Sequence, residues 1–342
     1  MGSEMCIRDS PEGVAALACL ERCVEEMATR SGEAGDQGNG NMGEQGPPYH
    51  LRRGWGIASG IKNIGYSFGY PEQSTAMIEL YGTTELERAV LRAGVAEVGQ
   101  GAHLAMRMIA AETLGLALEH VQLISDDSSE TPNMGSVSAS RMTLMGGRAV
   151  YEACRAALQQ WQDEERPARA TYQYRPPATT SLEAHTGVGR PNYCYGYVTQ
   201  AVELEVNTLT GQVQVQRIIS VHDVGRMINR QQVEGQIEGC LAQALGYALL
   251  EDLKIRDGKI LTPYFSTYLL PTSLDMPTEI IPIILEHADP KGPYGARGVG
   301  EMAMVPLAPA IAAAIYDAVG VWVSDLPMTP ERVLNALTNV QC

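Results

Sequence analysis

Apolar and polar positions along the chain follow two different periods. A period of two, typical of half-buried strands, occurs at residues 54–61, 74–81, 89–97, 121–125, 195–206, 212–222 and 279–286. A period near 3.6, typical of amphipathic helices, occurs at residues 14–27, 140–160 and 330–337, and directly after residues 100 and 236. Together these patterns predict an α+β fold, in which mixed sheets are covered by helices and two subdomains have similar sizes.

The same patterns divide the chain into four parts. Residues 1–10 are predicted to be non-native, because they resemble a translated sequencing adapter. Residues 11–48 are predicted to form a helix, followed from residue 31 by a flexible linker rich in Gly, Asn and Gln. Residues 49–190 are predicted to form a first subdomain and residues 191–342 a second.

Two segments depart from these regular patterns. Residues 162–191 are polar and Pro-rich, which predicts a surface loop. Residues 302–323 are nearly all apolar, but Pro306, Pro309 and Asp317 make this stretch a poor membrane span. We therefore expect a buried, Ala-rich core helix there.

Composition limits the class of protein. The 342 residues are 45% hydrophobic, which is enough for one large core or two ordinary ones. The net charge of −15 disfavours nucleic acid and anionic lipid as partners, because most of the surface would repel phosphate groups. Seven cysteines and no evident secretory signal predict a reduced, cytoplasmic protein.

Two side-chain pairs have the residue types of metal ligands. Cys19 and Cys23 share one helix face, but no second pair accompanies them, so they are predicted to be packing residues. His222 and Asp223 end a predicted strand, and Asp223 is predicted to hold the turn that follows it.

Three glycine-rich turns carry the candidate chemistry. Segment 292–301 has four glycines and ends at Glu301, where a buried general base is expected. Segments 97–101 and 233–239 place Gln100 and Gln236 beside glycines before a helical pattern, where free amides favour a phosphate or a polar ring edge. Taken alone, a glycine-rich turn that ends in Glu is more often a tight loop that leads into a helix. If the three converge, they form a polar cradle for one large cofactor.

Six segments in order resemble one known domain, the second molybdenum-cofactor-binding domain of the xanthine dehydrogenase and aldehyde oxidase family. The resemblance runs from about Pro11 to about Leu337. Its segments are EVGQG at 97–101, TPNMGSVSASR at 131–141, HDVGRMIN at 222–229, GQIEG at 235–239, GARGVGE at 295–301 and LPMTPE at 326–331.

The resemblance implies a molybdopterin enzyme in which both subdomains bind the cofactor and Glu301 is the general base. The cofactor is expected as molybdenum–molybdopterin, with the cytosine dinucleotide as an alternative form, and no residue is expected to bind the metal directly. For Ser140, a helix N-cap is the alternative role. The residues that the resemblance places at the cofactor are Gly99, Gln100, Gly101, Ala139, Ser140, Gln236, Arg297, Gly298, Val299 and Gly300.

The resemblance places Tyr66 and Ser67 at the substrate. Purine-oxidising members of the family carry Phe-Thr there, so the additional phenol oxygen of this chain argues against purine. The expected reaction is therefore hydroxylation of an aromatic N-heterocycle or an aldehyde. A tyrosine that only fills space in a glycine-rich hairpin is the structural alternative.

The sequence contains no iron–sulfur cysteine motif, no flavin domain and no match to the family's preceding domain. We therefore expect a C-terminal part of a large subunit, inactive alone, in a hetero-oligomer with iron–sulfur and FAD subunits. Two alternatives remain open: a reductive family member that acts on an aromatic thioester, and an inactive truncated assembly module.

Overall fold

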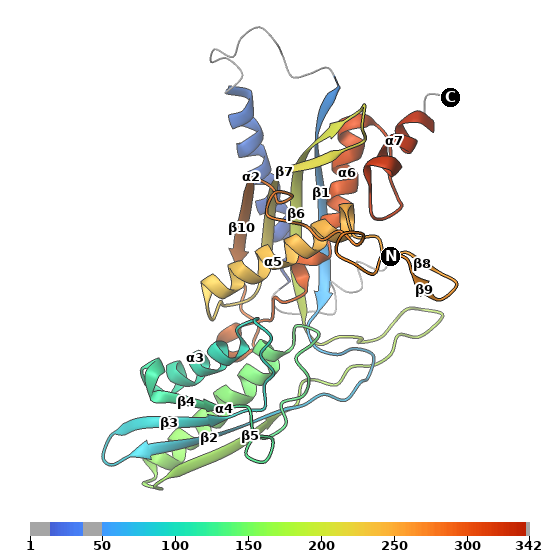
Figure 1. Cartoon of the computed structure of the whole chain (residues 1–342). Coiled ribbons are helices and arrows are strands. Elements are labelled where there is room, and N and C mark those ends of the chain that lie inside the picture. Colours follow the sequence, from blue (N-terminus) through green and yellow to red (C-terminus); the bar gives the residue numbers. More distant parts are fainter. Residues whose placement is uncertain (1–13, 37–49, 340–342) are drawn as a thin grey trace.

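The computed structural model describes residues 14–36 and 50–339 (Figure 1). The segment 1–10 and residues 37–48 of the predicted linker lie outside this part of the chain. The main helices are α2 (Ala16–Asp36), α3 (Ala102–Leu114), α4 (Gly147–Gln162), α5 (Arg230–Leu249), α6 (Leu307–Val319) and α7 (Pro330–Asn339). The strands are β1 (Leu51–Asn63), β2 (Ser74–Gly82), β3 (Leu86–Arg92), β4 (Val121–Ile124), β5 (Ala168–Tyr174), β6 (Tyr195–Asn207), β7 (Val213–Asp223), β8 (Ile255–Arg256), β9 (Lys259–Ile260) and β10 (Glu279–Leu285).

One four-stranded sheet has the order β1-β6-β7-β10, and its last pair is parallel. Helix α2 covers one face, while α5 and α6 cover the other (Figure 1). Successive side chains of β10 point to opposite faces of the sheet. Ile281 and Ile283 pack with the core under α2, whereas Ile280 and Ile284 pack with the core under α5 and α6. The predicted α+β arrangement of mixed sheets covered by helices is therefore confirmed.

A second four-stranded sheet, ordered β4-β3-β2-β5, lies beyond the first and carries α3 and α4 on one face (Figure 1). Ile78, Leu80 and Leu91 of this sheet are fully buried against Met106 and Ile109 of α3. Each half of the molecule therefore has its own hydrophobic core.

Two predicted boundaries are wrong. Strand β1 falls in the predicted first subdomain, 49–190, yet pairs with β6 over its whole length and so belongs to the sheet of the second. The chain thus starts one sheet, builds the other and returns, which no local pattern reveals. The predicted loop 162–191 contains β5, which pairs with β2 as an edge strand.

Helix α2 also differs from its predicted extent. It continues to Asp36, so the first residues of the predicted linker are helical. Cys19 and Cys23 are fully buried against the sheet, which confirms them as packing residues, and burial raises the pKa of each thiol to about 12. Leu17, at 65% exposed, points away from the sheet with Val24.

Helix α6 approaches β1 closely because β1 has two glycines. A Cβ at Gly54 or Gly56 would lie well under 3.0 Å from the carbonyl oxygen of Ala314 or Ala310. The apolar stretch Met302–Val319 has a mean hydropathy of 1.6, enough for a membrane span by length and composition. In the structure its helical part packs against both β1 and β6, as predicted for a core helix.

Gly56→Ala should destabilise the protein by about 1–3 kcal/mol, because the added methyl group must push α6 away from β1. The free energy of unfolding, measured by denaturant titration, tests this. Gly239→Ala is the matched control: its Cβ would meet open space within α5, so the substitution should raise stability by about 0.5–1 kcal/mol. Equal effects at both positions would contradict the close packing of α6 on β1.

Candidate cofactor site

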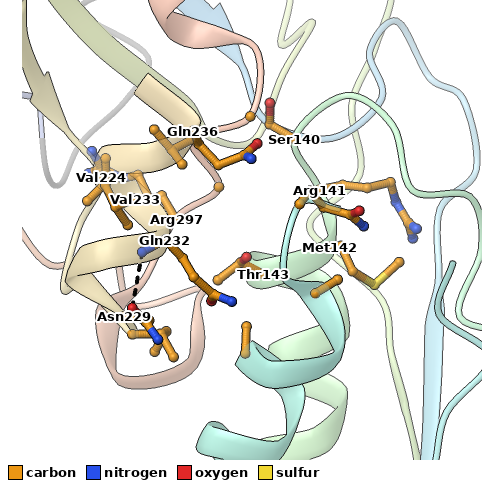
Figure 2. Close-up of a pocket in the computed structure, with 18 of the residues that line it drawn as sticks. Ser140, Arg141, Met142, Thr143, Val224, Asn229, Gln232, Val233, Gln236 and Arg297 are labelled. Carbon is orange, nitrogen blue, oxygen red and sulfur yellow. Dashed lines mark hydrogen bonds between the residues drawn. The ribbon is translucent and has the colours of Figure 1, made fainter. Parts of the chain in front are cut away.

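A cavity of about 260 Å³ lies between the two halves of the molecule. One wall comes from the loop before α4 and the start of α3. The other comes from the loop after β7, the start of α5 and the turn before α6 (Figure 2). Among the predicted cofactor residues, those that line the cavity are Gln100, Gly101, Ser140, Gln236, Arg297, Gly298, Val299 and Gly300, together with Glu301. Gly99 and Ala139 neighbour the lining residues but do not line the cavity themselves.

The two halves meet at Ser140. Ala139 and Ser140 have φ values of 51° and 52°, a left-handed conformation that non-glycine residues rarely adopt. This conformation brings the Ser140 carbonyl against Gly298, where an added Cβ would lie well under 3.0 Å from the oxygen. Ser140 Oγ also accepts a hydrogen bond from the Glu301 amide (3.1 Å) and donates one to Glu301 Oε2 (3.2 Å). The contact fixes the turn that carries Glu301.

The predicted N-cap role of Ser140 is wrong. The segment Met142–Gly146 forms a π-helical turn, and regular α4 begins only at Gly147. Ser140 lies before both elements, and its hydroxyl group serves Glu301 instead of a helix amide. A π-helical turn at a functional site is a recurring feature of helices.

The buried side chain of Arg141 holds the loop that carries Ser140 in place through several polar contacts. Its guanidinium is 1% exposed and forms an ion pair with Glu72 (Nε to Oε1, 2.7 Å). It also donates to the carbonyl oxygens of Met134 (2.9 Å), Ser136 (2.9 Å) and Gln73 (2.8 Å). One buried side chain therefore determines the path of the loop on its cavity side.

Arg297 plays a similar part in the opposite wall. Its Nη1 lies 2.6 Å from Asp223 Oδ2, with both side chains buried, and its Nε lies 3.4 Å from Asp289. Asp223 Oδ1 accepts from the Gly225 amide (3.1 Å), which confirms its predicted hold on the turn. The guanidinium of Arg297 is therefore used within the protein, and only the remainder of this residue can meet a cofactor.

His222 is not placed to act as an acid or base. It is fully buried, and burial lowers its pKa to about 3. Its Nε2 lies 2.8 Å from the Ser220 hydroxyl group. Within the described part of the chain, no cluster of three or more His, Cys, Asp or Glu could hold a metal ion.

The first glycine turn does not offer free amides. The carboxylate of Glu97 accepts hydrogen bonds from the amides of Gly99 (2.9 Å), Gly101 (2.8 Å) and His103 (3.0 Å) at the start of α3. Gln100 uses both ends of its side-chain amide on its own turn. The prediction of a phosphate at these amides is therefore wrong, because a carboxylate of the chain occupies them.

The second turn is part of a helix. Helix α5 begins at Arg230, after Asn229, whose Oδ1 caps the Gln232 amide at 3.1 Å (Figure 2). Segment 235–239 therefore lies inside α5, and its amides are not free as predicted. Gln236 instead presents its side chain to the cavity, across from Ser140 (Figure 2).

Tyr66 and Ser67 lie beside the cavity and do not line it. The Tyr66 hydroxyl group bonds the hydroxyl groups of Ser136 and Ser138, of which Ser138 lines the cavity (2.9 Å). These two bonds lower the pKa of the Tyr66 phenol. Ser67 Oγ donates to Asn192. Both side chains therefore have partners within the protein in addition to their predicted substrate role.

Glu301 lies at the edge of the cavity but is not buried as expected. Its side chain is 51% exposed, and its Oε2 lies 3.0 Å from the ammonium of Lys62, near the end of β1. The sequence indicated where this carboxylate lies, but it indicated neither its exposure to solvent nor its ion pair with Lys62.

The cavity suits a polar ring system. The half-buried amides of Gln232 and Gln236 line it, and neither side chain has a hydrogen-bond partner among the described residues. Amide groups with both donors and acceptors match the edge of a pterin. Residues 298–300 also line the cavity, and the two glycines among them, Gly298 and Gly300, have no side chain that would keep a ligand from the backbone.

The fold and the site together define an α+β cofactor-binding domain. The family described as "Molybdopterin cofactor-binding domain" matches residues 27–166 and 157–277. The chain therefore belongs to this family, which occurs in xanthine dehydrogenases and aldehyde oxidoreductases.

Three relatives illustrate the similarity. A probable xanthine dehydrogenase subunit of Bacillus subtilis is 30% identical over 319 residues, which cover 84% of this chain and 42% of the relative. Aldehyde oxidoreductase of Megalodesulfovibrio gigas is 32% identical over 307 residues, which cover 84% of this chain and 32% of the relative. The crystal structure of aldehyde oxidoreductase from Desulfovibrio desulfuricans gives a TM-score of 0.81 at 30% identity, covering 95% of this chain and 36% of that chain. The chain thus spans less than half the length of these relatives.

Sequence reasoning missed several polar residues of the cavity wall, among them Arg226, Asn229 and Gln232. Asn229 immediately before a helical run is a recognisable N-cap. If the helix begins after Asn229, then Gln232 and Gln236 are four positions apart and lie on the same helix face. The N-cap at Asn229 was therefore the sequence feature that could have identified Gln232.

Glu97→Gln should make the protein less stable at pH 7 by about 0.5–1 kcal/mol, because the exposed carboxylate holds the first amides of α3. Partial burial opposes ionisation, but the three amide hydrogen bonds prevail and lower the pKa of Glu97 from its ordinary 4.5. This stabilisation is therefore present above pH 4.5 and is lost as pH falls through the lowered pKa.

Denaturant titrations at a series of pH values below 7 test the Glu97 prediction, with the exposed Glu87→Gln as control. The difference between wild type and Glu97→Gln should shrink as the solution becomes acidic, whereas Glu87→Gln should show no such trend. A stability difference that is constant with pH would contradict the assignment.

Proposed function

We propose that this chain is the part of a molybdenum hydroxylase that holds the molybdopterin cofactor and supplies the catalytic base. The enzyme would oxidatively hydroxylate an aromatic N-heterocycle or an aldehyde. The observation that carries the proposal is Glu301 at the edge of a cavity that is lined by most of the predicted cofactor residues. The bound cofactor would supply the two-electron oxidation, which protein side chains cannot perform.

The residues of the chain would bind, orient and accept a proton. Gln236 and Gln232 would hydrogen-bond the ring edge, and the backbone of segment 298–300 would pass beside the cofactor. Glu301 Oε2 is held by Ser140 and Lys62, whereas Oε1 has no hydrogen bond from the described residues. Oε1 is therefore the atom available to take the proton released during hydroxylation.

The substrate proposal is supported by the relatives and by Tyr66. Two of the similar proteins are named aldehyde oxidoreductases, and one is named as part of the 6-hydroxypseudooxynicotine dehydrogenase complex. The Tyr66 hydroxyl group contacts Ser138 of the cavity wall, which places an aromatic side chain beside the cavity, and such a side chain is suited to a flat substrate.

The partner proposal also comes from the relatives' names. Several of these proteins are named as subunits of larger enzymes, among them a "Xanthine dehydrogenase molybdenum-binding subunit" and the gamma subunit of the 6-hydroxypseudooxynicotine dehydrogenase complex. We propose that iron–sulfur and FAD centres lie on partner subunits or on sequence outside this chain, since no cluster ligands occur among the described residues.

Glu301→Gln, in the molybdenum-loaded enzyme, should reduce turnover by about 10²–10⁴-fold while cofactor content stays unchanged, because the amide cannot accept the proton. Turnover is measured with a panel of aldehydes and N-heterocycles, and molybdenum and pterin are measured on the same samples. Glu238→Gln, on the exposed side of α5, is the control and should behave as wild type. Near-normal turnover in Glu301→Gln would overturn the proposed role.

A further inference from the structure

The ammonium of Lys62 contacts both Glu301 and Asn63. It lies 3.0 Å from Glu301 Oε2 and donates to the backbone oxygen (2.8 Å) and the side-chain oxygen (3.0 Å) of Asn63. All three acceptor oxygens lie within 3.0 Å of Nζ. The side chain is 21% exposed, so it is also held by its surroundings. Lys62 therefore has one defined position beside the carboxylate.

Asn63 extends this contact to the predicted substrate segment. Its side-chain amide donates to the Gly65 carbonyl oxygen (2.7 Å) and to Ser67 Oγ (3.1 Å). A continuous series of polar contacts thus joins Glu301, Lys62, Asn63 and Ser67. Since β1 pairs with β6 along its length, the backbone under Lys62 is fixed by the sheet.

Lys62 and Ser140 come from opposite halves of the molecule and hold the same oxygen. Lys62 belongs to the sheet that includes β6, whereas Ser140 belongs to the loop before α4. Both contact Oε2 of Glu301, at 3.0 and 3.2 Å. Two contacts from different directions restrict rotation of the carboxylate group and leave Oε1 directed elsewhere.

We propose that Lys62 is a positioning residue for Glu301, which holds Oε2 so that Oε1 stays available to accept the proton. The inference rests on the proposed function. Misplacement of a reacting group by about 1 Å can cost on the order of 100-fold in rate. The contact of Lys62 with Oε2 therefore affects the rate although Lys62 touches no reacting atom. Neither the glycine-rich motifs nor the predicted cofactor residues include this lysine.

A purely structural role would give a different pattern. Glu301 is half exposed, and ion pairs of this kind contribute little to folding. Removal of the Lys62 charge should therefore leave thermal stability nearly unchanged while turnover falls.

Lys62→Met and Lys62→Arg test the proposal in the molybdenum-loaded enzyme. Lys62→Met, whose unbranched side chain is one atom shorter and carries no charge, should lower kcat by about 10–100-fold, with KM and cofactor content close to wild type. Lys62→Arg should recover part of kcat, because it restores a cation beside Oε2. Wild-type kcat in Lys62→Met would overturn the proposal, as would a loss of kcat that is matched by a loss of folded protein.

A second readout does not depend on activity. Lys62 in the wild type should react slowly with an amine-acylating reagent, and its labelling, followed by mass spectrometry, should rise several-fold in Glu301→Gln, where the charged partner is gone. The exposed Lys259 is the internal control and should label equally in both proteins. Unchanged labelling of Lys62 would contradict the ion pair.

The failures of the two proposals can be told apart. If Glu301→Gln is inactive but Lys62→Met has normal kcat, only the positioning role of Lys62 falls. If Glu301→Gln turns over normally, the proposed base itself falls, whatever Lys62→Met does.

Discussion

The contact between Ser140 and the turn at Gly298 is the constraint on which the site depends. The two halves have separate cores, and beside the cavity they approach each other where the Ser140 carbonyl lies against Gly298, a residue without a side chain. The cost is local strain, since Ala139 and Ser140 both adopt left-handed conformations. Through this contact the cavity acquires two walls, and Glu301 is placed at its edge.

Two buried ion pairs hold the strained contact from either side. Arg141 with Glu72 supports the Ser140 loop, and Arg297 with Asp223 supports the turn that carries Glu301. Buried pairs contribute modestly to net stability, but removing one partner leaves an uncompensated charge and costs about 3–5 kcal/mol. They are therefore better explained as devices that fix geometry, and the cavity they shape has side chains that are free to meet a ligand.

The sequence predicted those features that depend on residues close together in the chain, namely the positions of strands and the motifs of the site. Strand alternation located β2, β6 and β10 to within a residue or two, and family motifs selected residues that converge on one cavity. The pairing of β1 with β6 could not be foreseen, because more than a hundred residues separate the strands. Likewise, free amides were expected at segment 97–101, but Glu97 folds back on them, and spacing does not show side-chain direction. Lys62 beside Glu301 is a consequence of the same long-range pairing.

The central claim is that the cofactor lies between the two halves and needs their close approach. Molybdenum and pterin analysis of wild type and Gly298→Val, both prepared from a molybdenum-replete host, tests it most directly. The account predicts stoichiometric cofactor in the wild type and its loss from a variant that remains folded by circular dichroism, because the new side chain would separate Gly298 from Ser140. Full cofactor retention in the variant, or none in folded wild type, would contradict the account.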